Sequence, residues 1–364
     1  MSANFDLTNL AIQALCPNNV LLYDDKNLPS VMVKIPKMTY AELGLGTSTA
    51  TFPAFIVNGT EVDEIYISKY QNIVRNGRAY SLPGQDPGNT IYGSDAIAAC
   101  TAKGAGWHLM TRMEWMAIAH WCKINGFMPN GNNNYGKDAS ESDYYAIPSC
   151  ARDENGKRQR VATGTGPLGW SHDGTANGIW DLNGNVWEWV GGIRLVYGEL
   201  QILANNNAAD LSNSQSLDSA QWKAINGTDG SLITPNGSGT TSNSLKLEWT
   251  GSTWQWITGT LTEANKGSHN ISFESVTVAG GISAAATLLL QALGLMKYDS
   301  TAGAYLGDWF YADTSEAERG FTCGGGWSGG ARAGVFDVDG HFSFFSVRYS
   351  TLGFRSAFVN LPTA

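Results

Sequence analysis

Residues 178–192 read GIWDLNGNVWEWVGG, and this stretch indicates the fold more strongly than any other part of the chain. Asp181, Asn183 and Glu188 place oxygen atoms around a turn that contains Gly184. Hard cations such as Ca²⁺ bind oxygen ligands of this kind, including backbone carbonyls. The residues are equally compatible with a structural turn held by the flanking tryptophans. The stretch therefore predicts either a cation site or a turn packed between aromatic rings.

The composition favours a loop-rich protein over a helical one. Of 364 residues, 15% are charged, 43 are Gly and 13 are Trp. So many glycines and tryptophans with so few charges indicate loops held by aromatic side chains. The net charge is −9, and no basic cluster is longer than residues 157–160. Proteins that bind nucleic acid usually present a basic stripe, so we expect no nucleic-acid partner.

Cysteine usage and hydropathy narrow the setting of the protein. The five cysteines are scattered and form no C-x-x-C pair, so they predict mostly buried thiols rather than disulfides or a zinc site. The most apolar stretch, residues 283–296, is too short to cross a bilayer, and we expect no membrane insertion. Residues 1–10 show no signal peptide, so synthesis in the cytoplasm is expected.

Residues 1–50 are predicted to form a small N-terminal element. The pattern at residues 4–17 predicts a helix that ends at a proline, and residues 18–25 and 30–38 predict short strands. Two glycines near residue 45 mark the expected end of the element.

A hairpin and two helices are predicted next. β-rich runs flank Asn58-Gly59, the strongest short turn signal. Helices are expected at residues 94–103 and after Thr111, where Thr111 and Glu114 form a T-x-x-E capping box. Methionines and tryptophans recur behind this box at helical spacing, so we assign them to the core.

Residues 125–175 and a long insertion after residue 197 predict loops. The insertion covers residues 197–280, or 197–317 when a short helix expected at 283–293 is included. Its portion 205–245 is mostly Asn, Ser, Gly, Thr and Asp, which bury little apolar area. Long irregular segments are usually functional or mobile. Binding, covering of the scaffold and mobility all remain open for this insertion.

Four blocks occur in an order that resembles the formylglycine-generating-enzyme branch of the C-type-lectin fold. VDEIYISKYQN at 62–72 is similar to the opening strand of that family, and GWHLMTRMEWMAIA at 106–119 to its helix start. GIWDLNGNVWEW at 178–189 is similar to its most specific motif. GGGW at 324–327 and LGFRSAF at 352–358 are similar to its C-terminal strands.

This resemblance, which covers about 54–195 and 320–358, implies the fold class. The expected fold is α+β and C-type-lectin-like, with small twisted antiparallel sheets, two helices and long loops over residues 51–364. It also implies a structural Ca²⁺ near the third block. The implied ligands are the side chains of Asp181 and Glu188 and the backbone carbonyls of Gly184 and Val186.

The same resemblance argues against catalysis. Formylglycine-generating members carry two cysteines just after the G-G-S-W block, and their thiolates bind copper. Here those positions fall near Gly329 and Gly334, and no cysteine follows Cys323. Glycine supplies no thiolate, and we expect His172 and His341 to be surface or binding residues. We therefore expect no catalytic residue and no catalytic cofactor, with an oxidase of the formylglycine-generating type as an alternative.

Residues 326–351, GWSGGARAGVFDVDGHFSFFSVRYST, resemble the variable region of diversity-generating retroelement proteins. In those proteins a reverse transcriptase miscopies adenines, so Asn-type codons change while a framework persists. The resemblance implies a variable region at about 324–355, with Trp327, Phe354 and Arg355 in the framework. The side chains expected to contact a ligand are Ser328, Gly329, Arg332, Asp337, Asp339, His341, Phe342, Phe344, Phe345, Tyr349 and Ser350.

These patterns together predict a binding protein, for receptor binding or surface display, whose C-terminal region is diversified to vary its target. The aromatic run at 342–349 supports this, since strand alternation would bury only half of it. The expected partner is a protein or glycan on a target cell, with residues 1–50 docking to a carrier. The expected location is a phage virion or a bacterial surface. A glycan-binding lectin-like protein of fixed specificity is the other alternative.

Overall fold

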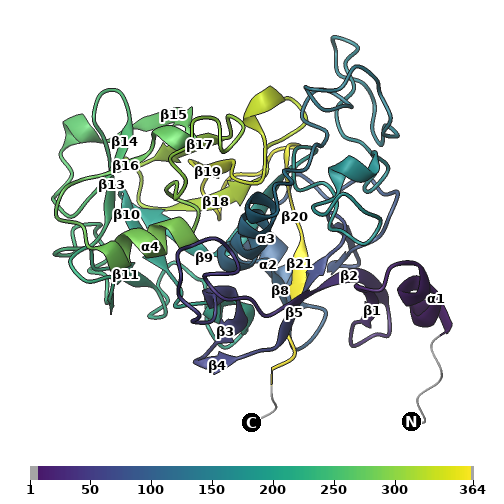
Figure 1. Cartoon of the computed structure of the whole chain (residues 1–364), viewed down its shortest axis with the longest axis horizontal. Coiled ribbons are helices and arrows are strands. Elements are labelled where there is room, and N and C mark those ends of the chain that lie inside the picture. Colours follow the sequence, from purple (N-terminus) through teal and green to yellow (C-terminus); the bar gives the residue numbers. More distant parts are fainter. Residues whose placement is uncertain (1–6, 362–364) are drawn as a thin grey trace.

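Residues 7–361 are described by the computed structural model, which combines two main β-sheets with four α-helices in that range (Figure 1). The predictions that rest on residues 1–6 lie outside the described residues. The fold is mixed α+β, with two more helices than the resemblance implies. The helices are α1 (Leu7–Leu15), α2 (Gly93–Thr101), α3 (Arg112–Ile124) and α4 (Ala284–Ala292).

The first sheet joins the N-terminal segment to the centre of the fold. Val33 and Ile35 of its second strand lie in the main core, and Met32, whose side chain points to the opposite face, is also fully buried. The N-terminal segment therefore shares a sheet with the rest of the chain. The antiparallel order is β1 (Asn19–Tyr23), β2 (Pro29–Pro36), β5 (Glu64–Ser68), β21 (Ser356–Phe358) and β8 (Trp107–Leu109).

The predicted turn at Asn58-Gly59 is confirmed. Both residues have positive φ, 50° and 77°, as a two-residue hairpin turn requires. The turn joins β3 (Ile56–Val57) to β4 (Thr60–Glu61). A second hairpin pairs β6 (Ile73–Arg75) with β7 (Arg78–Tyr80).

Helix α3 begins as its capping box predicts. The Thr111 hydroxyl accepts a hydrogen bond from the Glu114 backbone N–H, and the Glu114 carboxylate accepts one from the Thr111 backbone N–H. Met113 and Met116 are buried in the main core, as predicted, and Trp121 is half-buried against it. In Figure 1 the helix lies at the middle of the molecule, between the N-terminal strands and the insertion.

The insertion after residue 197 differs from the loop that its composition predicts. Leu247, Trp254 and Trp256 are fully buried in the main core, and even the polar portion 205–245 buries Trp222. A few large apolar side chains at strand spacing are enough to bury a segment that is polar on average. The insertion therefore packs as part of the fold, together with α4, on the left in Figure 1.

The strands of the insertion extend the second sheet well beyond the small antiparallel sheet predicted. Its order is β15-β17-β19-β18-β9-β10-β13-β14-β16, with β11 on β10, β12 on β11 and β20 on β9, and three of its pairings are parallel. The bounds are β9 (Trp187–Val196), β10 (Glu199–Ile202), β11 (Lys223–Ile225), β12 (Leu232–Ile233), β13 (Lys246–Trp249), β14 (Trp254–Ile257), β15 (Ser268–Ser272), β16 (Thr277–Val278), β17 (Trp309–Asp313), β18 (Arg319–Cys323), β19 (Val338–Gly340) and β20 (Leu352–Phe354).

Residues 125–175 form mainly turns and loops, as predicted. Among residues 7–361, no helix is both long and apolar enough to cross a membrane. The short 3₁₀ helices are η1 (Pro53–Phe55), η2 (Leu168–Trp170), η3 (Asn207–Ala209), η4 (Glu263–Asn265), η5 (Phe273–Ser275) and η6 (Gly330–Arg332).

Candidate functional site

An aromatic strip extends from η6 across β17 to the loop at residues 341–350. Trp309 and Tyr311 project from the same side of β17, since side chains alternate along a strand, and both are only half-buried. Phe310, between them, is fully buried. The Arg332 guanidinium lies 3.7 Å from the Trp309 ring centroid. The strip consists of Trp309, Tyr311, Arg332, His341, Phe342 and Tyr349.

Ring contacts make the remainder of the aromatic strip continuous. His341 stacks on Tyr311, with the ring centroids 4.0 Å apart and the planes at 14°. His341 also lies 3.7 Å from Phe342, and Phe342 meets Tyr349 edge-on at 5.7 Å. The buried Asp339 carboxylate holds His341 in place. It accepts a 2.9 Å hydrogen bond from the backbone N–H of His341 and another from Nδ1 of the His341 ring.

The backbone of the 341–350 loop is anchored although its outer side chains are exposed. The Glu318 carboxylate accepts hydrogen bonds from the Ser343 hydroxyl at 2.9 Å and the Phe344 backbone N–H at 3.2 Å. Burial raises the pKa of the Glu318 carboxyl. The Tyr349 carbonyl accepts a hydrogen bond from the Thr90 backbone N–H at 2.9 Å. The exposed side chains of this loop are Ser346, Arg348, Tyr349 and Ser350.

The predicted contact residues separate by burial. Asp337 and Asp339 are 3% exposed and Phe344 is 6% exposed, so an external ligand does not reach them. As contact residues these three are corrected to parts of the framework. The framework residues Trp327, Phe354 and Arg355 are buried, as predicted. The predicted contacts that are exposed are Ser328, Arg332, Tyr349 and Ser350, and those that are half-buried are Gly329, His341, Phe342 and Phe345.

Phe344 is buried because two glycines leave room for its ring. A Cβ atom at Gly93 would lie 2.3 Å from that ring, and one at Gly320 would lie 2.7 Å from it. Trp189 meets the same ring edge-on with the centroids 5.3 Å apart. The aromatic run alone does not reveal this packing, since both glycines come from other segments.

Asp337 is buried beside a second carboxyl group. Burial and the neighbouring Asp308 raise the pKa of Asp337 well above its usual range. Burial also raises the pKa of Asp308 to about 8, although the Phe336 backbone N–H donates a 2.8 Å hydrogen bond to Asp308 Oδ2. A Cβ atom at Gly334 would lie 2.2 Å from Asp308 Oδ1, so this position admits only glycine without a shift.

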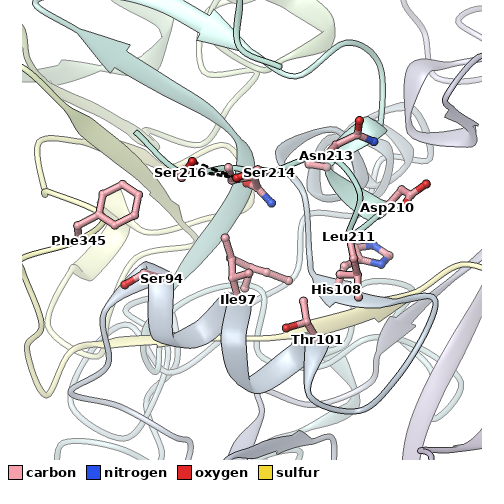
Figure 2. Close-up of a pocket in the computed structure, with 13 residues that line it drawn as sticks. Ser94, Ile97, Thr101, His108, Asp210, Leu211, Asn213, Ser214, Ser216 and Phe345 are labelled. Carbon is pink, nitrogen blue, oxygen red and sulfur yellow. Dashed lines mark hydrogen bonds between the residues drawn. The ribbon is translucent and has the colours of Figure 1, made fainter. Parts of the chain in front are cut away.

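A groove of about 370 Å³ borders the loop, between α2 and residues 208–216 (Figure 2). Phe345 lies at one side of it, and Ile97 of α2 supplies apolar surface below. Asn213 and Ser214 line the opposite wall with polar groups. Sequence reasoning missed the groove because its walls come from segments that are distant along the chain. The strand residues Trp309 and Tyr311 were missed too, although their alternation in WFYAD offered a signal.

Three of the four groups predicted to bind a cation surround a side-chain amide instead, and the backbone carbonyl of Asp181 takes the place predicted for its side chain. Gln71 Nε2 lies 3.2 Å from the Asp181 carbonyl oxygen, 3.4 Å from that of Gly184 and 3.0 Å from that of Val186. It also lies 3.1 Å from Glu188 Oε1. We call these four oxygen atoms the oxygen ring. An N–H donor thus occupies the position that the resemblance gives to Ca²⁺.

The charge of Glu188 in the oxygen ring is already balanced by an arginine. The Arg355 guanidinium donates two hydrogen bonds of 2.6 Å to the Glu188 carboxylate, and both side chains are at most 1% exposed. The Asp181 side chain points to the Gly164 backbone N–H, at 2.9 Å, and burial raises its pKa to about 6. Among residues 7–361, no group of three or more His, Cys, Asp or Glu side chains could hold a metal ion. The residues present therefore do not fit Ca²⁺.

The thiol nearest to the glycine-rich motif is not poised for chemistry. Cys323 is buried, Arg112 Nη1 donates a 2.8 Å hydrogen bond to its Sγ, and burial raises the pKa of the thiol to about 12. The surface position predicted for His172 is wrong, since it packs against Trp121 and burial lowers its pKa to about 4. His172 Nδ1 instead accepts a hydrogen bond from the Ile179 backbone N–H.

No protein-family model matches the chain, and no curated protein matches it. Three solved structures share low identity with it. PvdO from Pseudomonas aeruginosa is 14% identical to this chain with a TM-score of 0.29, and the match covers 93% of this chain and 97% of the PvdO chain. Treponema denticola variable protein 1 is 11% identical with a TM-score of 0.33, covering 93% and 98%. A Major Tropism Determinant P3c variant is 9% identical with a TM-score of 0.31, covering 93% and 71%.

Proposed function

We propose that this chain is a ligand-binding protein with a C-type-lectin-like scaffold of the formylglycine-generating-enzyme subtype. Its contact surface is the aromatic strip together with the exposed side chains of the 341–350 loop. The observation that carries the proposal is an anchored backbone beneath half-buried aromatic rings and one exposed ring, that of Tyr349, which is 54% exposed. Aromatic and arginine side chains gathered at a surface are typical of binding sites. Binding of this kind requires no catalytic residue and no catalytic cofactor.

We further propose that a retroelement diversifies this surface. Diversification requires that side chains change without disturbing the fold, and substitutions at exposed positions usually alter stability by less than about 0.5 kcal/mol. Ser328, Arg332 and Ser350 are exposed, whereas Trp327 and Phe354 beside them in sequence are buried. The contact and framework positions are thus separate in space although they are interleaved along the chain.

The proposed ligand is a protein or glycan on the surface of a target cell. The proposed carrier is a phage virion or a bacterial surface, bound through the N-terminal segment. Helix α1 supports this arrangement, since in Figure 1 it lies at the edge of the molecule, far from β17. One end of the molecule would then hold the carrier while another meets the target.

A genomic measurement tests diversification. The DNA around the gene is sequenced and searched for a reverse-transcriptase gene and an imperfect copy of codons 326–351. We expect mismatches confined to adenines, in codons for exposed residues such as Tyr349 and not in those for the buried Phe344. If no copy exists and sister genomes keep the segment unchanged, diversification is rejected.

A binding measurement tests the surface itself. Native protein, Tyr349→Ala and the control Tyr145→Ala are applied to arrays of glycans and cell-surface proteins. Tyr145 is 58% exposed and lies outside the aromatic strip, so it matches Tyr349 in type and exposure. We expect Tyr349→Ala to weaken binding about tenfold or more, because aromatic anchors dominate binding energy. Equal loss in the control would place the contact surface elsewhere.

A glycan-binding protein of fixed specificity is the second candidate, and the groove in Figure 2 favours it. Phe345 offers an aromatic face, while Asp210, Asn213 and Ser216 offer hydrogen-bonding groups. Two results together would favour this candidate over diversification. Phe345→Ala would lose glycan binding, and sister genomes would keep residues 326–351 unchanged.

A further inference from the structure

We propose that Gln71 and Arg355 together replace the divalent cation in the oxygen ring, so that this part of the fold is independent of metal. A bound Ca²⁺ does two things in a ring of oxygen ligands: it satisfies their lone pairs and it neutralises their charge. In this chain the two tasks fall to two different side chains, an amide and a guanidinium. Neither depends on the ligand-binding role proposed above.

The first task falls to the amide of Gln71. Its Nε2 lies 3.0–3.4 Å from the four oxygens of the ring. The orientation of the amide follows from its other end, where Gln71 Oε1 accepts a 3.0 Å hydrogen bond from Asn185 Nδ2. The backbone of Val161 orients Asn185 in turn. Asn185 Nδ2 donates a hydrogen bond to the Val161 carbonyl, and Asn185 Oδ1 accepts one from the Val161 N–H. The nitrogen of Gln71 must therefore face the ring.

The second task falls to Arg355. Its guanidinium forms a two-pronged ion pair with Glu188, and two further donors reach the carbonyls of Ser68 and Trp180 at 2.9 and 3.0 Å. An arginine with four of its five N–H donors paired in this way is fixed in place and does not exchange for an ion. A divalent cation in the ring would have to displace a buried amide and would meet no uncompensated negative charge on Glu188.

The oxygen ring also supports the segment that leads to the contact surface. The Gly184 backbone N–H donates to the Gly324 carbonyl at 2.7 Å, and the Trp327 backbone N–H donates to the Asn185 carbonyl at 3.1 Å. These bonds join the ring to the glycine-rich framework before η6. A ligand bound by the aromatic strip would consequently not depend on a divalent ion in the oxygen ring.

The native protein provides the first test. Its Tm is measured after treatment with EDTA and again with about 5 mM CaCl₂, where a site of even millimolar affinity would stabilise the fold. Terbium luminescence sensitised by tryptophan and the metal content after purification are measured in parallel. We expect Tm shifts below about 1 °C and no bound metal. A rise of about 3 °C or more with calcium, or one metal ion per chain, would overturn the proposal.

Variants at residue 71 provide the second test. Gln71→Met keeps the volume but removes the donors, and we expect its Tm to fall by about 5 °C or more because the three buried backbone carbonyls of the ring lose this donor. Gln71→Glu places a carboxylate in the ring, and we expect calcium to raise the Tm of this variant alone. The control Gln85→Glu makes the same charge change at a partly exposed amide that contacts only the Pro83 carbonyl.

The outcomes at residue 71 separate clearly. A Gln71→Met protein as stable as the native one would show that the amide does not hold the ring. A Gln71→Glu protein without a calcium response would show that the ring is not a cation-type arrangement. If either variant does not fold, the metal response of the native protein still decides between amide and cation.

Discussion

The oxygen ring and the aromatic strip are built in opposite ways. In the ring, Glu188 and Arg355 are at most 1% exposed and the four oxygens surround the NH2 group of Gln71. In the strip, the backbone is bonded beneath while rings stack at the surface, with Tyr349 54% exposed. The difference teaches where the chain tolerates change: substitutions in the ring should affect stability, and those in the strip should affect binding.

The largest expected effect comes from breaking the buried ion pair. Arg355→Met leaves the Glu188 carboxylate buried without a counter-charge, and we expect a loss of about 3–5 kcal/mol in the free energy of unfolding. Urea denaturation measures it, with Arg152→Met at an exposed position as the control. Adding Glu188→Gln to Arg355→Met should recover part of the loss, because a neutral amide needs no counter-charge. A loss below about 1 kcal/mol would contradict the pairing.

A smaller loss is expected where the framework meets the loop. Gly93→Ala places a Cβ atom 2.3 Å from the Phe344 ring, which also packs edge-on against Trp189. We expect a loss of about 1–3 kcal/mol, typical of overpacking. Gly169→Ala is the matched control, since a Cβ atom there meets nothing within 4 Å. Equal unfolding free energies for the two variants would mean that Phe344 repacks freely.

The buried carboxyl of Asp308 should make stability depend on pH. Its pKa is raised by burial to about 8, so between about pH 4 and pH 8 the folded state holds a proton that the unfolded state has lost. Stability is therefore greatest below this window and falls as the pH rises through it. Asp308→Asn should flatten that slope and stabilise the protein by about 1–3 kcal/mol near pH 8. Urea denaturation at about pH 5 and about pH 8 measures the free energy of unfolding of both proteins. An equal change between the two pH values in Asp308→Asn and in the native protein would contradict this prediction.

The smallest effect on stability is expected in the aromatic strip. Tyr349→Ala removes an exposed ring, and we expect the free energy of unfolding to change by less than about 0.5 kcal/mol. The same variant should lose ligand binding, as measured on the arrays described above. A stability loss comparable to that of Gly93→Ala would show that the strip belongs to the framework and not to the contact surface.

By itself the sequence determined the elements that depend on neighbouring residues. The Asn58-Gly59 turn and the Thr111–Glu114 capping box form within a few residues, so local chemistry predicts them and the structure contains both. Helix α4, which begins after Ser283, was predicted from its apolar run in the same way. The burial of the framework residue Phe354 followed from the motif that contains it.

Only the tertiary structure decided which distant side chains meet. The Gln71 amide reaches the oxygen ring from a segment more than a hundred positions away, as its hydrogen bond to Asp181 shows, and no local pattern signals that contact. Phe344 became framework because Gly93 and Gly320 make room for it, and Tyr311 joined the strip because β17 pairs with β19. Spacing along the chain specifies turns, caps and strand faces, but a cavity or a buried donor depends on partners that only folding brings together.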